Sequence, residues 1–166
     1  MPLAFTYPLM KRYTYWPQLF LGITFNYGLI LGWTSVTNDL SVIPIIFYIG
    51  AIFWTLGYDT IYGFQDIKDD EIIGLKSTSI KFKKNPTLFL HICYSIFLLG
   101  LFSSSYLMNL NILSYIIFLF VIMHLYYFQL NNLNFKTPSS CLKIFKSNNF
   151  LGLLVFTGLL LGKLLQ

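Results

Sequence analysis

Charge is the scarcest property of this 166-residue sequence: only 10% of its residues are Asp, Glu, Lys or Arg, whereas 56% are hydrophobic. Soluble domains carry about 25% charged residues, and a small globule has a large surface that polar groups must cover. The mean hydropathy is correspondingly high, at +0.67. This composition excludes a soluble enzyme and a disordered chain, and it indicates an integral membrane protein.

Cysteine is scarce as well. Cys93 lies in an apolar run and Cys141 in a polar stretch, so the two form neither a disulfide framework nor a metal-binding spacing. The formal net charge of +5 does not indicate a nucleic-acid partner, because the basic residues are not interleaved with exposed aromatics in a soluble stretch. In a membrane protein such an excess more often reports topology.

Five apolar stretches approach the ~20 residues that a membrane-spanning helix needs. Pro17, Pro44 and Pro86 stand in or near the first turn of three of them, where the missing N–H costs no hydrogen bond. We therefore expect an all-α transmembrane bundle that forms a single domain over residues 1–166, with a solvated or interfacial loop at Asn131–Asn149. The expected spans are about residues 17–35, 42–58, 87–108, 112–130 and 150–165.

The distribution of basic residues predicts the orientation of these spans. Ten of the eleven Lys and Arg residues fall on one side of the expected bundle, and only Lys163 does not. The opposite loops, Val36–Ser41 and Asn109–Asn111, contain no Lys or Arg. The positive-inside rule places the basic side in the cytoplasm or its organellar equivalent. We expect a bacterial inner membrane, with a mitochondrial inner membrane as the alternative.

The acidic residues are gathered in one place, since all but one of the six lie between Asp59 and Glu71. If the second span continued as a helix through this segment, Asp59, Tyr62, Asp66 and Asp70 would share an arc of about 80°. Unpaired carboxylates one turn apart repel each other and destabilise a helix. Their clustering therefore favours a bound cation.

Mg²⁺ suits such a site, because it prefers oxygen ligands and takes few of them from the protein when phosphates and water supply the rest. Asp66 and Asp70 are the expected metal ligands, with Asp69 at the edge of the arc. The alternative is a solvated charged loop in which Lys68 and the lysines that follow it balance the acids.

A second polar cluster, residues 7–12, precedes the first span on the same side of the membrane. On topology alone it is a basic anchor at the membrane surface. Beside a Mg²⁺–phosphate site, Lys11 and Arg12 could instead neutralise diphosphate oxygens.

Together, these two clusters resemble motifs of the UbiA superfamily of membrane prenyltransferases, and most closely its 4-hydroxybenzoate polyprenyltransferase branch. Residues 58–78 read YDTIYGFQDIKDDEIIGLKST and resemble the second aspartate-rich motif with its trailing Gly-x-Lys-Ser-Thr. Residues 7–22 read YPLMKRYTYWPQLFLG and resemble the stretch that carries the family's Tyr-x-x-x-Lys element.

The resemblance implies a function. Family members use Mg²⁺ to bind a polyprenyl diphosphate, ionise it, and let an aromatic ring attack the allylic cation. The resemblance therefore implies prenyl transfer to an aromatic acceptor, with 4-hydroxybenzoate in ubiquinone biosynthesis as the expected case. The implied catalytic residues are Asp59, Asp66, Asp70 and Lys11, the implied metal ligands are Asp66, Asp70 and Asp69, and the implied substrate-binding residues are Tyr7, Lys11, Arg12, Tyr62 and Lys76.

The resemblance covers only the C-terminal half of the family's nine-span fold. The family's first motif, of the Asn-Asp-x-x-Asp-x-x-x-Asp type, has no counterpart in this sequence. The chain is therefore expected to be a gene fragment, a product of a split or frame-shifted gene, or a half that pairs with a separate N-terminal half. The alternatives are a non-catalytic membrane fragment and a cation transporter, although transporters usually place ionisable groups at mid-span.

Overall fold

The computed structural model describes residues 9–165, and the regular secondary structure of this part of the chain is all helical, with no strand. This confirms the expected all-α architecture. Five helices are long and apolar enough to cross a membrane, as an integral membrane protein requires. The elements in chain order are α2 (Pro17–Thr37), α3 (Val42–Gly63), α4 (Ile67–Ile72), α5 (Thr78–Lys81), α6 (Pro86–Leu107), α7 (Ile112–Ile122), the π-helix η1 (Met123–Leu130) and α8 (Pro138–Leu164).

The helix ends follow local chemistry. Prolines open α2, α6 and α8, because the ring fixes a helical φ and the absent N–H would have been unpaired. Asn38 ends α2 with a φ of 53°, and Asn109 has the same φ in the turn after α6. Asparagine tolerates this left-handed conformation better than most residues. Both turns are therefore short.

The prediction of a loop at Asn131–Asn149 was wrong for most of its length, because α8 already begins at Pro138 and not near residue 150. One face of its polar first half is buried, through Cys141, Ile144 and Asn148. These residues continue the helical spacing of Leu151 and the buried residues beyond it. Lys143 and Lys146 are exposed between them. This segment is therefore an amphipathic helix, although its polar composition is typical of a loop.

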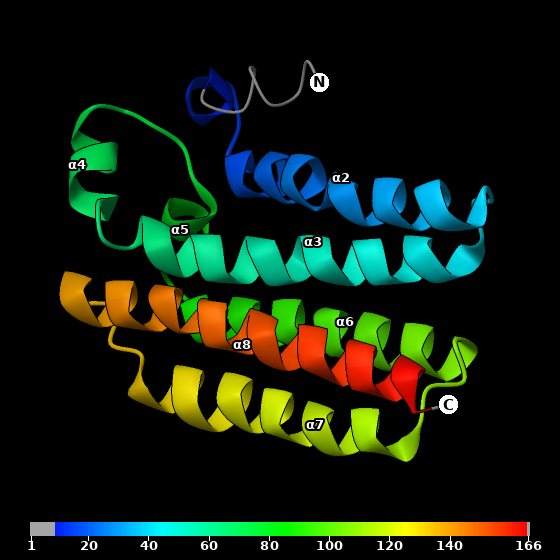
Figure 1. The fold of residues 1–166 in the computed structure, drawn as a ribbon. Coiled ribbons are helices and arrows are strands. Elements are labelled where there is room, and N and C mark those ends of the chain that lie inside the picture. The colour runs from blue at the N-terminus through cyan, green and yellow to red at the C-terminus, as the bar shows by residue number, and fades with distance from the viewer. Residues whose placement is uncertain (1–8, 166) are drawn as a thin grey trace.

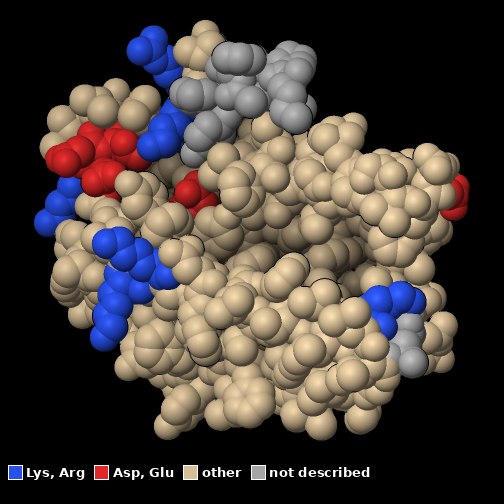
Figure 2. Space-filling model, in the orientation of Figure 1, with Lys and Arg blue, Asp and Glu red and all other residues tan. Residues whose placement is uncertain are grey.

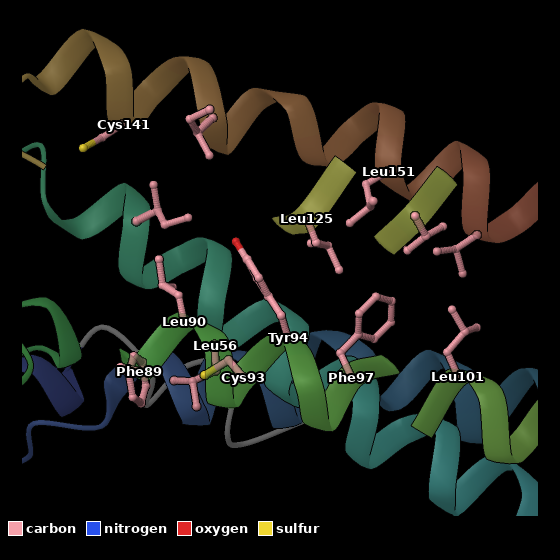
Figure 3. Packing of buried hydrophobic residues seen from close by; sticks show 14 of the residues in the cluster. Leu56, Phe89, Leu90, Cys93, Tyr94, Phe97, Leu101, Leu125, Cys141 and Leu151 are labelled. Atoms are coloured by element: carbon pink, nitrogen blue, oxygen red, sulfur yellow. The ribbon is translucent and has the colours of Figure 1, made fainter. Parts of the chain in front are cut away.

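Helix α3 is the centre of the bundle and packs against α2, α6 and α8, while α7 packs against α8 (Figure 1). Its approach to α6 depends on glycine: a Cβ built on Gly100 would lie 3.0 Å from the Cα of Gly50. Small residues let helix backbones come this close in a membrane. The hydrophobic core contains Tyr94, Phe97 and Leu101 of α6, whose side chains point toward the neighbouring helices (Figure 3).

The second half of the fourth span is a π-helix, which no pattern in the sequence predicts. Residues five apart on it, His124 and Gln129, both contact the Ser147 hydroxyl, at 3.2 and 3.4 Å. In an α-helix they would diverge by about 140°, whereas a π-helix brings residues five apart into register. The π-helix thus presents two polar side chains to the same turn of α8.

Candidate functional site

The acidic segment does not continue α3 as one helix, so the predicted common arc of Asp59, Asp66 and Asp70 was wrong in its geometry. Helix α3 ends at Gly63, the N–H of Phe64 bonds back to Ile61, and α4 restarts after Asp66. Gly63 fits because a Cβ there would lie 2.4 Å from the Ser79 hydroxyl. The acids therefore come from two helices and the turn between them.

Around α4 the three aspartates differ in burial. Asp66 and Asp69 are exposed, whereas Asp70 is buried, with 6% relative exposure. The N–H of Asp70 donates to the carbonyl of Asp66 at 2.9 Å, so these two residues lie one helical turn apart. Asp69 and Asp70 also occupy the first turn of α4, where negative charge is favourable.

The basic cluster that precedes α2 meets this acidic segment. The Lys11 ammonium lies 3.4 Å from a carboxylate oxygen of Asp70, and its charge also acts on Asp59. The backbone joins the same two segments, because the N–H of Lys76 donates to the carbonyl of Lys11 at 2.7 Å. Two clusters that are distant in sequence thus form one charged site, and Lys and Arg gather beside Asp and Glu at one end of the molecule (Figure 2).

The segment that follows α4 is held in place by buried hydroxyls. The hydroxyls of Thr60 and Thr78 are 2.6 Å apart, and Ser79 donates to the carbonyl of Thr60 at 2.8 Å. The side-chain oxygen of Gln18 accepts from the N–H of Thr78 at 3.1 Å. Thr78 of the motif and the Ser79 that follows it therefore hold the loop between α3 and α6 against α2 and α3.

A cavity of about 580 Å³ opens beside this site between α2, α3 and α8. Tyr58, Asp59 and Phe145 line it, together with Trp54 and Asn148. The Asp59 carboxylate belongs to the charged site and also lines the cavity. The charged site therefore adjoins a mostly apolar cavity at Asp59. Such a cavity can hold an apolar or aromatic group next to a bound anion.

A hydrogen-bonded chain fixes the inner wall of the cavity. The Trp54 indole N–H donates to Asn148 at 2.9 Å, and the Gln129 amide donates to the same oxygen at 3.2 Å. The Tyr94 hydroxyl in turn donates to Gln129 at 2.6 Å. Sequence reasoning missed these residues, although isolated Gln and Asn side chains within apolar stretches are a signal of buried polar contacts.

The remaining predicted site residues are more peripheral. Tyr7 lies outside the described residues, and Arg12 is exposed. The Tyr62 ring lies 4.7 Å from that of Phe145. The Lys76 ammonium contacts the carbonyl of Tyr13 at 3.4 Å. Lys11, Asp59 and Asp70 therefore form the centre of the site.

The carboxylates of this site determine which kind of metal ion it could hold. Among residues 9–165 no group of three or more His, Cys, Asp or Glu side chains is arranged to hold one. Asp66 and Asp70 offer two carboxylates one turn apart. A pair of this kind fits Mg²⁺, which usually keeps several waters and binds through one or two carboxylates and substrate phosphates. It does not fit an ion that needs a full set of protein ligands.

Comparison with known proteins identifies relatives over almost the whole chain. It is 41% identical to the mitochondrial 4-hydroxybenzoate polyprenyltransferase of Drosophila melanogaster, over 99% of this chain and 42% of the relative. It is 44% identical to the Bos taurus protein of the same name, over 98% of this chain and 44% of the relative. The 4-hydroxybenzoate geranyltransferase 2 of Lithospermum erythrorhizon is 39% identical, over 98% of this chain and 53% of the relative.

The chain therefore spans roughly half the length of these relatives, or somewhat less. No solved structure matches it. The UbiA prenyltransferase family matches residues 1–156, which is nearly the whole sequence and includes both charged clusters. The chain belongs to the UbiA prenyltransferase family.

Proposed function

We propose that this chain forms the part of a prenyltransferase that binds a polyprenyl diphosphate through Mg²⁺ and transfers its prenyl group to an aromatic acceptor. The observation that carries the proposal is the Lys11–Asp70 ion pair beside Asp59, at the edge of a cavity lined by apolar and aromatic groups. Charged groups for a diphosphate and an apolar space for its prenyl chain thus adjoin each other.

In this proposal Asp66 and Asp70 hold Mg²⁺, with Asp69 beside them. When bound, the ion neutralises diphosphate oxygens and favours their departure. Lys11 is already positioned by Asp70 and contributes a fixed positive charge where negative charge develops. Lys76, Arg12 and Tyr7 supply further contacts to the diphosphate.

The transfer breaks the bond between the allylic carbon and the diphosphate oxygen, and the electron pair leaves with the diphosphate. The acceptor ring then forms a carbon–carbon bond to the allylic carbon and loses a ring proton, which the departed diphosphate accepts. Trp54, Tyr58 and Phe145 surround this step with aromatic groups, which exclude water and can stabilise a cation. Asp59 orients the acceptor at the cavity edge, near Tyr62.

We favour 4-hydroxybenzoate as the acceptor, because it appears in the names of the relatives. The reaction would then serve ubiquinone biosynthesis. The fly and cattle relatives are named as mitochondrial proteins, which favours a mitochondrial inner membrane over a bacterial one for this chain. The charged site would face the matrix.

The proposal also assigns a role to the part of the relatives that lies outside the matched segment, here called the complementary half. The chain carries one aspartate-rich motif, whereas the resemblance calls for two. We propose that a separate N-terminal half supplies the second motif and the rest of the cavity wall. The relatives have more than half, or nearly half, of their length outside the matched segment, which leaves room for such a half.

Binding of geranyl diphosphate to the purified chain, with and without Mg²⁺, tests the site directly. We expect binding to require Mg²⁺ and to weaken at least tenfold in Asp66→Asn and Asp70→Asn, because each loses a carboxylate that faces the ion. Prenylation of 4-hydroxybenzoate is then measured in membranes that also contain the complementary half, and Asp59→Asn is expected to lower it at least tenfold.

Asp39→Asn is the matched control, because Asp39 is exposed and follows α2 at the far end of the bundle. It should leave both binding and transfer unchanged. Binding that is equal with and without Mg²⁺, or unchanged in the Asp66→Asn, Asp70→Asn double variant, would contradict the proposed site. Mg²⁺-dependent binding without transfer in the presence of the complementary half would instead indicate a non-catalytic protein.

A further inference from the structure

An asparagine, Asn26, stands near the middle of α2, the first of the spanning helices. It follows the start of the helix at Pro17 by nine residues, which is about 14 Å along the helix axis. It also lines the cavity beside Asp59. A polar side chain at this depth is costly unless hydrogen bonds satisfy it, so the partners of each amide atom indicate what the side chain does.

The amide nitrogen of Asn26 is engaged within the protein. It donates to the backbone carbonyls of Gly22 and Ala51 at 2.8 and 3.3 Å, and it contacts the Thr55 hydroxyl at 2.8 Å. Backbone carbonyls only accept hydrogen bonds, so these contacts fix which end of the amide is the nitrogen. The nitrogen therefore joins α2 to α3 and holds the side chain in one orientation.

The amide oxygen of Asn26 is different. Within residues 9–165, every hydrogen bond of the Asn26 side chain runs through its nitrogen. The oxygen is not sealed inside the protein either, because the buried polar atoms that lack a partner in this part of the chain belong to Trp33 and Ser41. It is therefore an accessible acceptor in the wall of the cavity.

A second asparagine of the same cavity, Asn148, provides the comparison. Its oxygen accepts from the Trp54 indole and the Gln129 amide, and its nitrogen donates to two backbone carbonyls of α8. Both ends of that amide are satisfied by the protein. Contacts between and within helices thus account for all of Asn148, but only for the nitrogen of Asn26.

We propose that the Asn26 oxygen accepts a hydrogen bond from the phenolic hydroxyl of the aromatic acceptor, which makes Asn26 a specificity-determining residue. This inference rests on the function proposed above, from which it takes the class of ligand. Thr55, which holds the amide, is one helical turn from Asp59 on α3. The hydroxyl would therefore enter the cavity beyond Asp59, toward the middle of the membrane.

This arrangement selects for a ring that can donate a hydrogen bond. A ligand without the donor displaces water from the Asn26 oxygen and leaves that oxygen without a partner, which lowers its affinity. The protein cannot compensate by turning the amide, because the nitrogen would then leave the two backbone carbonyls. The selectivity is thus built into the contact between α2 and α3.

Equilibrium dialysis of the purified chain in detergent, without Mg²⁺ or diphosphate, tests the proposal. The two ligands are 4-hydroxybenzoate and 4-fluorobenzoate, which are close in size, although only the hydroxyl can donate. We expect the wild type to bind 4-hydroxybenzoate about fivefold more tightly, which corresponds to one net hydrogen bond. Asn26→Leu should remove this preference by weakening the binding of 4-hydroxybenzoate alone.

Two further variants are matched controls. Thr55→Val removes one partner of the amide nitrogen and leaves both backbone carbonyls, so the preference should persist. Asn149→Leu changes an exposed asparagine of the same cavity lining and should also preserve it. Far-UV circular dichroism checks folding. If Asn26→Leu does not fold, Asn26→Gln replaces it, since the longer side chain displaces the oxygen and should abolish the preference.

Several outcomes would overturn the proposal. They are no binding of 4-hydroxybenzoate to the wild type, equal affinity of the wild type for both ligands, and a preference that survives in the folded Asn26 variant. Loss of the preference in Asn149→Leu but not in the Asn26 variant would assign the hydroxyl to the other asparagine and would overturn it as well.

The readout is separate from the proposed activity, because neither ligand carries a diphosphate. If Mg²⁺-dependent binding of geranyl diphosphate fails while Asn26 still discriminates between the two ligands, the phenol contact stands and the proposed prenyl transfer fails. If geranyl diphosphate binds as expected but the Asn26 variant keeps the preference, the proposed function stands and the role of Asn26 is wrong.

Discussion

At the scale of single residues, Lys11 and Asp70 show how an exposed and a buried charge depend on each other. The Lys11 side chain is 36% exposed, whereas that of Asp70 is 9% exposed. Water can solvate much of the ammonium when it is alone, but little of the carboxylate. The pair therefore positions Lys11, while Lys11 makes the burial of Asp70 tolerable.

This asymmetry predicts unequal costs for breaking the pair. Lys11→Met leaves a buried carboxylate without its cation and should lower the free energy of unfolding by about 1–3 kcal/mol. Asp70→Asn leaves a lysine that water can solvate and should cost less than Lys11→Met. Thermal unfolding in detergent, monitored by circular dichroism, measures both variants. Equal losses, or a larger loss in Asp70→Asn, would contradict this account.

The residue scale also shows which parts of the site the sequence could predict. Asp59, Asp70 and Lys11 were singled out because charge is rare in this chain, and the structure places Lys11 beside both acids. Their role in binding stays a prediction. Trp54 and Asn148 were not identified, because their contact joins residues 94 positions apart. A pattern along the chain carries no information about which helices become neighbours.

At the scale of elements, α3 and α6 are held together by the contact of Gly50 with Gly100. A Cβ on Gly100 would lie 3.0 Å from the Cα of Gly50 and 3.0 Å from the carbonyl oxygen of Ile46. Both neighbours are backbone atoms, so neither can rotate away. The two helices would have to separate along their interface.

Gly100→Ala should therefore destabilise the bundle by about 1–3 kcal/mol, the usual cost of overpacking a tight contact. Gly28→Ala is the comparison, since a Cβ there meets nothing within 4 Å and alanine favours the helix. Unfolding in detergent should show a lower midpoint for Gly100→Ala and an unchanged or higher one for Gly28→Ala. A similar midpoint for the two variants would show that the glycine contact does not limit packing.

The elements also show where hydropathy alone is insufficient. Proline and apolar length predicted the beginnings of α2, α3 and α6, because helix starts depend on local chemistry. The start of α8 at Pro138 was missed, since the polar residues of its first turns obscured the periodic burial of Cys141 and Ile144. Ser79 lies against Gly63, where α3 ends, and no local pattern reports that contact between distant residues.

At the scale of the whole molecule, the charged site lies at one end of the bundle and Asp39 follows α2 at the other (Figure 1). Helices α4 and α5, which contain or adjoin five of the ten lysines, lie where α3 ends and α6 begins. The positive-inside rule predicts that this end lies on the inner side of the membrane. The site would then face the cytoplasm or the matrix.

Cysteine labelling in sealed membranes tests this orientation. Lys84→Cys should react with a membrane-impermeant maleimide from the cytoplasmic or matrix side, and Asp39→Cys should react only from the opposite side. Both native residues are exposed, whereas Cys93 and Cys141 are buried. The unmodified chain therefore provides the background. Labelling of both variants from the same side would contradict an odd number of crossings between them.

The π-helix at Met123–Leu130 has a consequence for how this part of the chain tolerates insertion and deletion. Its wide turn accommodates a surplus residue, and that surplus brings Gln129 to Tyr94 and Asn148. Removing one residue between His124 and Phe128 would leave Gln129 four positions after His124, and four residues of an ordinary α-helix turn by about 400°, so the two side chains would still share one face. The length of this segment is therefore matched to its winding. At the present length, ordinary α-helical winding would turn Gln129 about 140° from His124 and would detach it from Tyr94 and Asn148, although every side chain of the hydrogen-bonded chain would still be present.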